Sequence, residues 1–329
     1  MRWLIVMPYV RPGAMGTDFA EELRALGHAV ETFGYRRDNV LYKNKPTKAA
    51  YQRALNRRLE RLCADQSPDV VLVVKGGPIE PDVIRRIRAA TGALVVNFFP
   101  DNPLWTMPFQ QIEPYDLFFT KERYALRQLE MVGLRNLYYL PMYCVPAVHH
   151  PVELAEDEAA ALRGTIALVG ACYPYRERLV RELVDYPIRV WGPGWRRTDP
   201  KIAPRVAGGF LEGRAKLAVY CGATLSLNPH HPMNDVVGVN TRAFELAAAG
   251  ACQVVDLKDE LSHLFKPGEE VVAFRDLPEL RRQLTYYLAH PDETRAIGDN
   301  ARRRALAEHT ARHRIEEMLG AIRDRCGRR

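Results

Sequence analysis

The chain has 329 residues, of which 26% are charged, and its net charge is +7. This length predicts two domains, each large enough to bury its own core. The densest basic runs are followed or interrupted by Glu308, Glu316 and Glu317, which indicates solvated helix faces and argues against nucleic acid as a partner. No apolar run approaches the roughly 18 residues that a membrane span needs.

The start of the chain and its cysteines predict a cytoplasmic protein. The apolar run at residues 3–7 follows a single basic residue and is too short for a signal peptide. The six cysteines are scattered, without a C-x-x-C pair or a spacing typical of metal ligands. Free thiols in a reducing compartment are therefore the expected state.

In the first half of the chain, short apolar runs alternate with helical patterns. The runs that predict strands are residues 3–7, 29–33, 70–74, 94–98 and 117–120. The patterns that predict helices are residues 17–26, 47–64, 81–90 and 122–132. This alternation predicts a parallel sheet that is covered by helices on both faces.

The second half repeats the alternation after a stiff connector at residues 141–151, which contains three prolines. Its predicted strands are residues 165–169, 188–191, 224–227, 252–255 and 271–274. Its predicted helices are residues 176–184, 213–221, 241–249, 277–288, 293–308 and 311–323. The fold class is therefore α/β, with Rossmann-like domains over residues 1–145 and 152–310 that would form a cleft. Ligands in such sheets lie beyond the carboxyl ends of the strands.

Residues 229–256 carry the densest set of local signals, and they predict a loop, a helix of about ten residues and a buried strand. Asn240 or Thr241 is a natural N-cap for this helix. Gly250 lies where a left-handed C-terminal cap is expected. An apolar strand follows directly.

Arg242 and Glu245 lie one turn apart on the polar face of this helix. A helix N-terminus already attracts anions, because its free N–H groups and dipole act as about half a positive charge. An added Arg suits a phosphate, and a Glu one turn later suits sugar hydroxyls. The alternative is an ordinary i, i+3 salt bridge on a solvated helix.

The string G-V-N-T-R-A-F-E-L-A-A-A-G-A, residues 238–251, resembles the donor-site helix of GT-B glycosyltransferases and is closest to the spore-maturation (CgeB-like) branch. In the wider retaining superfamily, the second Glu of an E-x7-E motif on this helix binds the nucleotide ribose. The resemblance gives that role to Glu245. The first Glu of the motif falls on Val237, so half of the motif is missing here. The resemblance also implies two domains facing across a cleft, and a terminal helix at residues 311–329 that crosses back to the N-terminal domain.

Further donor-site candidates follow the first strand of the second half. The string G-A-C-Y-P-Y-R contains Gly170, Tyr173 and Arg176, a G-x-x-Y-x-x-R pattern that the resemblance assigns to donor binding. Gly170 would let the backbone approach a ligand closely, and Arg176 opens the next helix, where a phosphate could lie. The alternative is a surface β–α turn with an exposed arginine.

The next two strands also end in candidate donor residues. Gly192 and Gly194 mark a tight turn in W-G-P-G-W, and the Trp191 and Trp195 rings either flank a nucleobase or pack in the core. Asn228 ends a strand in S-L-N-P and is a candidate donor contact.

The N-terminal half supplies candidates for the acceptor side. The loop after the first strand carries Gly13 and Gly16, and in GT-B enzymes this loop faces the cleft and often meets the acceptor or the sugar phosphate. Lys75 ends the third strand, and Asp101 and Asn102 follow the fourth in a D-N-P turn that also occurs in the CgeB-like branch. A carboxylate at Asp101 can act as a base on an acceptor hydroxyl or stabilise an oxocarbenium-like state. The alternative is a simple Asp/Asn-Pro turn.

Together these features predict a glycosyltransferase that moves a sugar from a nucleotide-diphosphate sugar, with a UDP-sugar as the expected donor, to an unidentified acceptor. Arg176, Arg242 and the helix N-terminus would neutralise the diphosphate in place of a metal ion. Retention is expected, because the second Glu of the motif belongs to the retaining group. The alternatives are a sugar-nucleotide epimerase of the same fold and a non-catalytic module that binds nucleotides or glycans.

Overall fold

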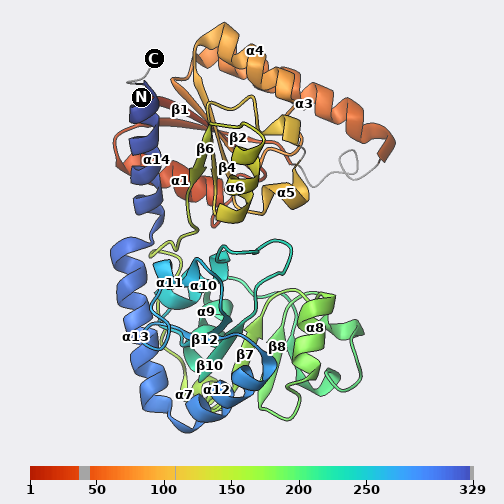
Figure 1. Cartoon of the computed structure of the whole chain (residues 1–329), viewed down its shortest axis with the longest axis vertical. Helices are drawn as coiled ribbons and strands as arrows, with labels where there is room; N and C mark the ends of the chain where they lie inside the picture. The colour runs from red at the N-terminus through yellow and green to blue at the C-terminus, as the bar shows by residue number, and fades with distance from the viewer. Residues whose placement is uncertain (37–44, 108, 327–329) are drawn as a thin grey trace. The chain divides into compact units, whose positions relative to one another are not determined.

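The computed structural model describes residues 1–36, 45–107 and 109–326, and it divides into two compact α/β units (Figure 1). Unit 1 comprises Met1–Pro141 together with Ala311–Arg329, and unit 2 comprises Met142–Thr310. The chain therefore leaves unit 1 once, forms all of unit 2, and then returns to unit 1.

Unit 1 contains a parallel sheet with the strand order β2-β1-β3-β4-β5-β6. Its strands are β1 (Arg2–Met7), β2 (Ala29–Gly34), β3 (Val70–Val74), β4 (Leu94–Phe99), β5 (Leu117–Thr120) and β6 (Leu137–Tyr139). Its helices are α1 (Met15–Ala25), α3 (Lys45–Gln66), α4 (Pro81–Thr91), α5 (Pro103–Thr106), α6 (Arg123–Met131) and α14 (Ala311–Cys326), and η1 (Phe109–Gln111) is a short 3₁₀ turn.

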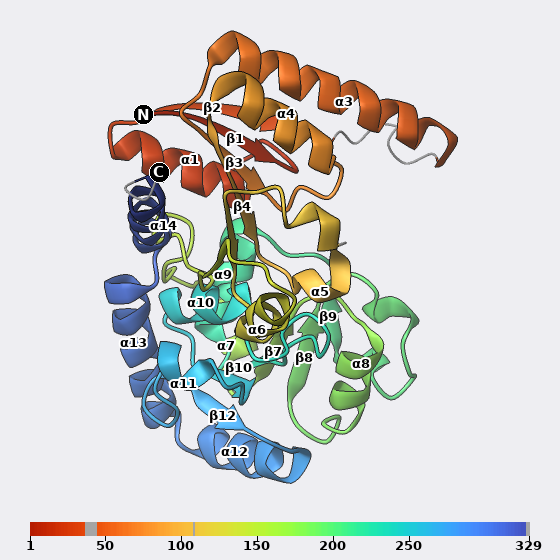
Figure 2. The same cartoon turned by 45° about the horizontal axis from the view of Figure 1, so that its top comes forward.

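The central strands of unit 1 are mostly apolar because helices cover both faces of the sheet. Every residue of β3 is buried, as expected for a parallel strand with no solvated face. On one face, Leu4 of β1 belongs to a core cluster with Leu59 of α3 and Ile84 of α4. On the other face, the ring of Phe98 in β4 meets Phe19 of α1 edge to face. Figure 2 shows α3 beside α4, and α1 beside α14.

The helix α14 joins unit 1 although it follows all of unit 2 in the chain. Its buried apolar side chains recur at the spacing of one helix face and are Ala311, Ile315, Met318, Leu319 and Ile322. It packs against α1, and Arg312 Nη1 lies 3.6 Å from Glu22 Oε2 of that helix.

Unit 2 contains a second parallel sheet with the strand order β12-β11-β10-β7-β8-β9. Its strands are β7 (Ile166–Val169), β8 (Ile188–Trp191), β9 (Val206–Gly208), β10 (Leu225–Asn228), β11 (Gln253–Asp256) and β12 (Val272–Phe274). Its helices are α7 (Glu156–Leu162), α8 (Pro174–Arg181), α9 (Gly213–Gly222), α10 (Thr241–Ala248), α11 (Leu261–Leu264), α12 (Leu277–Ala289) and α13 (Pro291–Glu308).

The predicted α/β class with two parallel sheets is confirmed. The strands and helices that the sequence pattern did not predict are short, and the missed strands β6 and β9 are three-residue strands at the sheet edges. In the described part of the chain, no helix combines the length and apolarity of a membrane span.

Candidate functional site

The helix α10 begins and ends as its sequence predicts. Asn240 is the N-cap, and its side-chain oxygen accepts a hydrogen bond from the Ala243 backbone N–H at 3.0 Å. Thr241 is then the first helical residue. At the other end, Gly250 adopts a left-handed φ of 74° and donates its N–H to Ala247 O at 2.9 Å. This pattern ends the helix and directs the chain into β11.

Arg242, in the first turn of α10, is held by a buried amide. The side-chain oxygen of Asn228, at the end of β10, accepts hydrogen bonds from Arg242 Nη1 and from Asn240 Nδ2, both at 3.1 Å. Asn228 Nδ2 donates to Gln253 Oε1 at 3.1 Å. Asn228 is fully buried, so in this structure it orients the arginine.

A second guanidinium lies beside Arg242 at the carboxyl end of β7. Arg176, on α8, is only 4% exposed, and its Nη1 and Nη2 donate to Ala171 O at 2.7 Å and Pro229 O at 3.2 Å. A Cβ atom at Gly170 would lie 2.7 Å from a terminal nitrogen of Arg176 and 2.7 Å from one of Arg242. Only a residue without a side chain fits between the two arginines.

This arginine pair is a concentration of positive charge in which Arg176 is buried and Arg242 is partly buried. Within residues 1–36, 45–107 and 109–326, neither guanidinium forms an ion pair with Asp or Glu. Burial and the nearby charge of Arg242 lower the pKa of Arg176 to about 10. Buried charge is unfavourable unless a counter-charge completes it. The pair and the adjacent N-terminus of α10 are therefore suited to an anion.

Tyr173 and the two turn glycines shape the wall beside the arginine pair. The Arg176 guanidinium lies 4.3 Å from the centre of the Tyr173 ring, a cation–π contact. The Tyr173 hydroxyl is buried and has no hydrogen-bond partner among the described residues. A Cβ atom at Gly192, where φ is +140°, would lie 2.2 Å from Gly170 O, so the loops after β7 and β8 are packed together. Gly194 approaches Cys172 in the same way.

The tryptophans that flank these glycines belong to core clusters. Trp195 is buried, and its Nε1–H donates to Gly170 O at 2.8 Å. Trp191 is buried in the cluster on the other side of the sheet. Packing thus accounts for both rings, and the alternative of stacking on a nucleobase is not supported.

Glu245, one turn after Arg242, forms an ion pair that the sequence did not indicate. Its Oε2 accepts from Lys216 Nζ of α9 at 3.0 Å, and its Oε1 lies 3.8 Å from His149 Nε2. Burial raises the pKa of Glu245, but Lys216, His149 and Arg242 outweigh it, so this pKa is lowered overall. The predicted alternative of a salt bridge to Arg242 is not among the contacts of the described residues.

A second unpredicted ionic contact joins the loops after β10 and β11. Asp256 Oδ1 accepts from the backbone N–H of His230 and contacts its Nδ1, both at 2.7 Å, and Lys258 Nζ lies 3.3 Å from Asp256 Oδ2. Burial opposes the charge on Asp256, but His230 and Lys258 lower its pKa. This contact fixes the start of the loop that leads to Asn240.

In unit 1, Lys75 and Asp101 come together at the carboxyl edge of the sheet. Lys75 Nζ lies 2.6 Å from Asp101 Oδ2, and the side chains are 38% and 30% exposed. Lys75 adopts a left-handed φ of 61°, which is strained for a residue with a side chain and is typical of functional sites. The Asn97 side chain donates to Lys75 O at 3.1 Å, and the Tyr35 hydroxyl accepts from Gly76 N at 3.1 Å, so the turn is held from both sides.

The other acceptor-side candidates have structural roles. Asn102 is the N-cap of α5 and accepts from Leu104 N at 3.1 Å. A Cβ atom at Gly16 would lie 2.7 Å from Met7 Cβ, so this glycine lets α1 pack on β1. Gly13, with φ of 70°, makes a turn and has no neighbour within 4 Å of the Cβ position.

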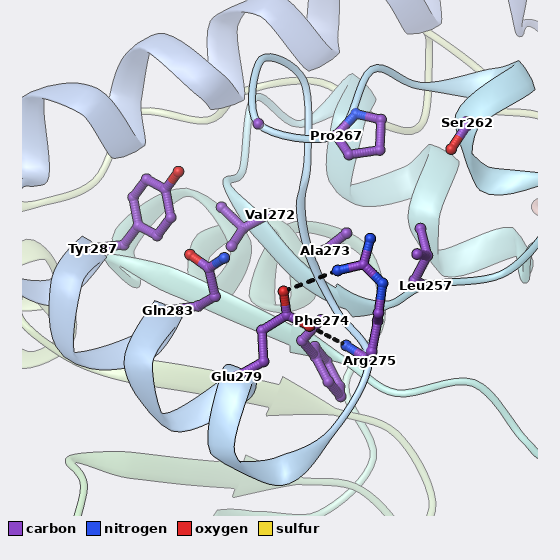
Figure 3. A pocket seen from close by; sticks show the side chains of 11 residues that line it. Leu257, Ser262, Pro267, Val272, Ala273, Phe274, Arg275, Glu279, Gln283 and Tyr287 are labelled. Atoms are coloured by element: carbon purple, nitrogen blue, oxygen red, sulfur yellow. Dashed lines mark hydrogen bonds and ion pairs between the residues drawn. The ribbon is translucent and has the colours of Figure 1, made fainter.

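A separate cavity of about 250 Å³ lies beside β12 and α12 (Figure 3). Its charged groups are Arg275 and Glu279, which are hydrogen-bonded to each other at 2.8 and 3.2 Å. None of the predicted donor or acceptor residues is among those that line it. Because its charges are already paired, this cavity is a poorer anion site than the arginine pair.

Comparison with protein families gives one match. Residues 176–320 match the model of a family described as "Glycosyl transferase-like". The chain carries a glycosyl transferase-like domain. This stretch includes Arg176, Asn240, Arg242 and Glu245. No curated protein matches the sequence.

Solved structures share the fold over essentially the whole chain. Sucrose-phosphate synthase (tll1590) from Thermosynechococcus elongatus is 14% identical, with a TM-score of 0.76 and all of both chains covered. Anabaena Alr3699/HepE in complex with UDP is 11% identical, with a TM-score of 0.68, and 98% of this chain and 100% of that one are covered. AviGT4, a glycosyltransferase involved in avilamycin A biosynthesis, is 16% identical, with a TM-score of 0.64. The match covers 99% of this chain and 98% of that one.

These findings confirm the predicted GT-B fold and the glycosyltransferase class of the domain. The assignment to the CgeB-like branch stays a prediction. So do the roles of the individual site residues.

Proposed function

We propose that this protein transfers a sugar from a UDP-sugar to an acceptor hydroxyl, without a metal ion and with retention at the anomeric carbon. The observation that carries the proposal is the pair formed by the buried Arg176 and the partly buried Arg242 at the N-terminus of α10. An electrostatic site of this kind stabilises charge that develops on a departing diphosphate.

Unit 2 is the nucleotide-sugar unit in this proposal. The arginine pair and the free N–H groups of α10 bind the diphosphate, so they provide the positive charge that a divalent metal provides in other enzymes. Gly170 leaves room for the two guanidinium groups to lie side by side against the backbone. The UDP complex of Anabaena HepE, which shares the fold, supports a uridine nucleotide as the first donor to test.

Glu245 binds the ribose in this proposal. A carboxylate accepts hydrogen bonds from two neighbouring hydroxyls, and Glu245 is kept ionised by Lys216. His149, whose pKa is lowered by burial, lies beside the same carboxylate. The hydroxyls of the ribose would share Glu245 with Lys216.

Unit 1 is the acceptor unit, with Asp101 at the reacting hydroxyl. The bond between the anomeric carbon and the diphosphate oxygen breaks, and its electron pair stays on the diphosphate. The acceptor oxygen forms a bond to the anomeric carbon and gives up its proton. Lys75 Nζ lies 2.6 Å from Asp101 Oδ2, so one oxygen of this carboxylate already has a hydrogen-bond partner. We therefore assign the proton to the departing diphosphate, and to Asp101 the orientation of the hydroxyl.

The proposal is tested by incubating the protein with UDP-, GDP-, ADP- and dTDP-sugars and measuring released nucleotide. Release that increases with added acceptor supports transfer. A changed sugar without release supports the epimerase, and binding without any turnover supports the non-catalytic module. A nucleotide at a hundred times its dissociation constant stabilises the fold by about 2.7 kcal/mol, which a thermal-shift screen detects.

The arginine pair provides the structural control. Arg176→Met removes one buried charge, and Arg178→Met removes an arginine of the same helix that is exposed and paired with Glu182. Loss of nucleotide binding in the first variant alone is the expected result. Equal binding in both variants would contradict the proposed donor site.

A further inference from the structure

Exposed apolar side chains follow Asp101 in unit 1. Trp105 of α5 is 47% exposed. Leu104, directly before it, and Phe109, four residues after it, are also exposed. Leu104, Trp105 and Phe109 come from one short stretch of chain, so they are a local group and not scattered surface residues.

The segment that carries these side chains is held in a fixed position. The Asn102 side chain caps α5, and Thr106 Oγ1 donates to Asn102 O at 3.1 Å. Gln111 Nε2 donates to Gly77 O at 3.4 Å, and Asp101 pairs with Lys75. The loop after β3 and the segment after β4 are therefore joined by a hydrogen bond and by the Lys75–Asp101 ion pair, and Trp105 follows Asp101 four residues later.

The ion pair on this surface determines which chemical groups are suited to it. Lys75 and Asp101 are neutral together and lie about one-third exposed, so they offer a hydrogen-bond donor and an acceptor side by side. Asp101 repels a phosphate or carboxylate, and Lys75 repels a cation. A hydroxyl can donate to Asp101 and accept from Lys75 at the same time.

The indole of Trp105 is suited to the other side of the same ligand. A sugar ring has an apolar face of C–H groups and a rim of hydroxyls. An indole ring offers a large, rigid apolar surface to the C–H face, and weak C–H contacts to it add to the attraction. Hydroxyls at the rim would then reach the ion pair.

We propose that Lys75, Asp101 and Trp105 bind a neutral saccharide as the acceptor. The inference rests on the proposed glycosyl transfer for its role as acceptor, although the binding site itself does not. One hydroxyl of the saccharide is held by the Lys75–Asp101 pair, and one ring face lies on Trp105. That hydroxyl supplies the oxygen that replaces the diphosphate at the anomeric carbon, and its proton leaves with the diphosphate.

The test measures binding of glucose, galactose, mannose, N-acetylglucosamine and maltose, each with and without UDP, by tryptophan fluorescence and calorimetry. Glucose 6-phosphate and an octyl glucoside are compared with glucose. We expect at least one neutral sugar to bind, and its phosphorylated form to bind at least about tenfold more weakly, because of Asp101. Trp105→Ala should weaken sugar binding about tenfold and leave UDP affinity unchanged.

Phe210→Ala is the matched control, because Phe210 is an exposed aromatic residue of unit 2. It should bind sugars as the parent does. Asp101→Asn leaves the Lys75 ammonium without its counter-charge, so it should shift the preference about tenfold toward glucose 6-phosphate. A selectivity shift of this sign is not produced by a merely structural change.

Several outcomes would overturn the inference. These are binding of no neutral sugar at high millimolar concentration, unchanged sugar affinity in Trp105→Ala, and an affinity that depends on the octyl chain instead of the sugar. The last outcome would favour an apolar acceptor. Sugar binding without any nucleotide binding would support the saccharide site and would contradict only the proposed sugar transfer.

Discussion

The terminal nitrogens of Arg176 and Arg242 each lie 2.7 Å from the position that a side-chain carbon would take on Gly170. The two arginines come from different helices, α8 and α10. One is held by backbone carbonyl oxygens and the other by Asn228. Their like charges are therefore kept together by neutral hydrogen bonds, which is unfavourable for stability and favourable for binding an anion.

Gly170→Ala should weaken nucleotide binding by about tenfold or more, which corresponds to about 1.4 kcal/mol. The added methyl group must displace at least one guanidinium, because both lie within contact distance. Calorimetry with UDP measures the effect. Gly209→Ala is the control, because a Cβ atom there meets nothing within 4 Å. Unchanged UDP affinity in Gly170→Ala would mean that the arginines do not touch the nucleotide.

Arg176→Met should abolish most nucleotide binding, yet leave the melting temperature of the free protein equal or higher. Replacing buried charge by a well-packed apolar side chain is often neutral or stabilising by about 1–4 kcal/mol. Here the charge is also repelled by Arg242, which helps to lower the pKa of Arg176. Thermal unfolding without ligand, together with a UDP titration, separates the two effects. A large loss of stability would indicate a structural arginine.

Glu245→Gln should weaken UDP binding by about 1.5–3 kcal/mol, the range for a hydrogen bond that involves a charged group. The difference in unfolding free energy between the parent and this variant should depend on pH in a defined direction. The pKa of Glu245 is lowered from 4.5, so its ion pair contributes fully above that value and is lost as the pH falls. Urea unfolding should show parent and variant differing at pH 7 and converging as the pH falls below 4.5 and through the lowered pKa of Glu245. A difference that persists in acid would contradict the pairing.

Activity should be the same in EDTA and in added magnesium or manganese. The arginine pair and the N-terminus of α10 already neutralise the diphosphate in the proposed complex. Nucleotide release is the measurement, with a metal-dependent transferase as the positive control for the chelator. Activity that disappears in EDTA and returns with metal would show that the arginines are insufficient.

Local signals in the sequence specified much of unit 2. The Asn240 cap and the turn at Gly250 each depend on residues within a few positions, and both are found as predicted. The strand at residues 188–191 has its predicted bounds for the same reason. By contrast, the edge strands β6 and β9 are too short to show a period.

The partners of the charged residues could not be predicted in this way. Lys216 and Glu245 are 29 positions apart, and Lys75 and Asp101 are 26 apart. Each pair forms because strand order and helix packing bring separate loops together. Neither Lys216 nor its helix α9 carries a local signal for this contact, so only the assembled sheet shows it.

The return of the chain to unit 1 as α14 has a consequence for biosynthesis. When the ribosome has made Pro141, all six strands of unit 1 have been synthesised, but the helix that covers part of α1 has not. The roughly 170 residues of unit 2 must be translated first, which at about 5–20 residues per second takes on the order of 10–30 seconds. During that interval an apolar face of the nascent protein is open to chaperones and to wrong partners. Unit 2, which is made as one continuous stretch, has no such wait.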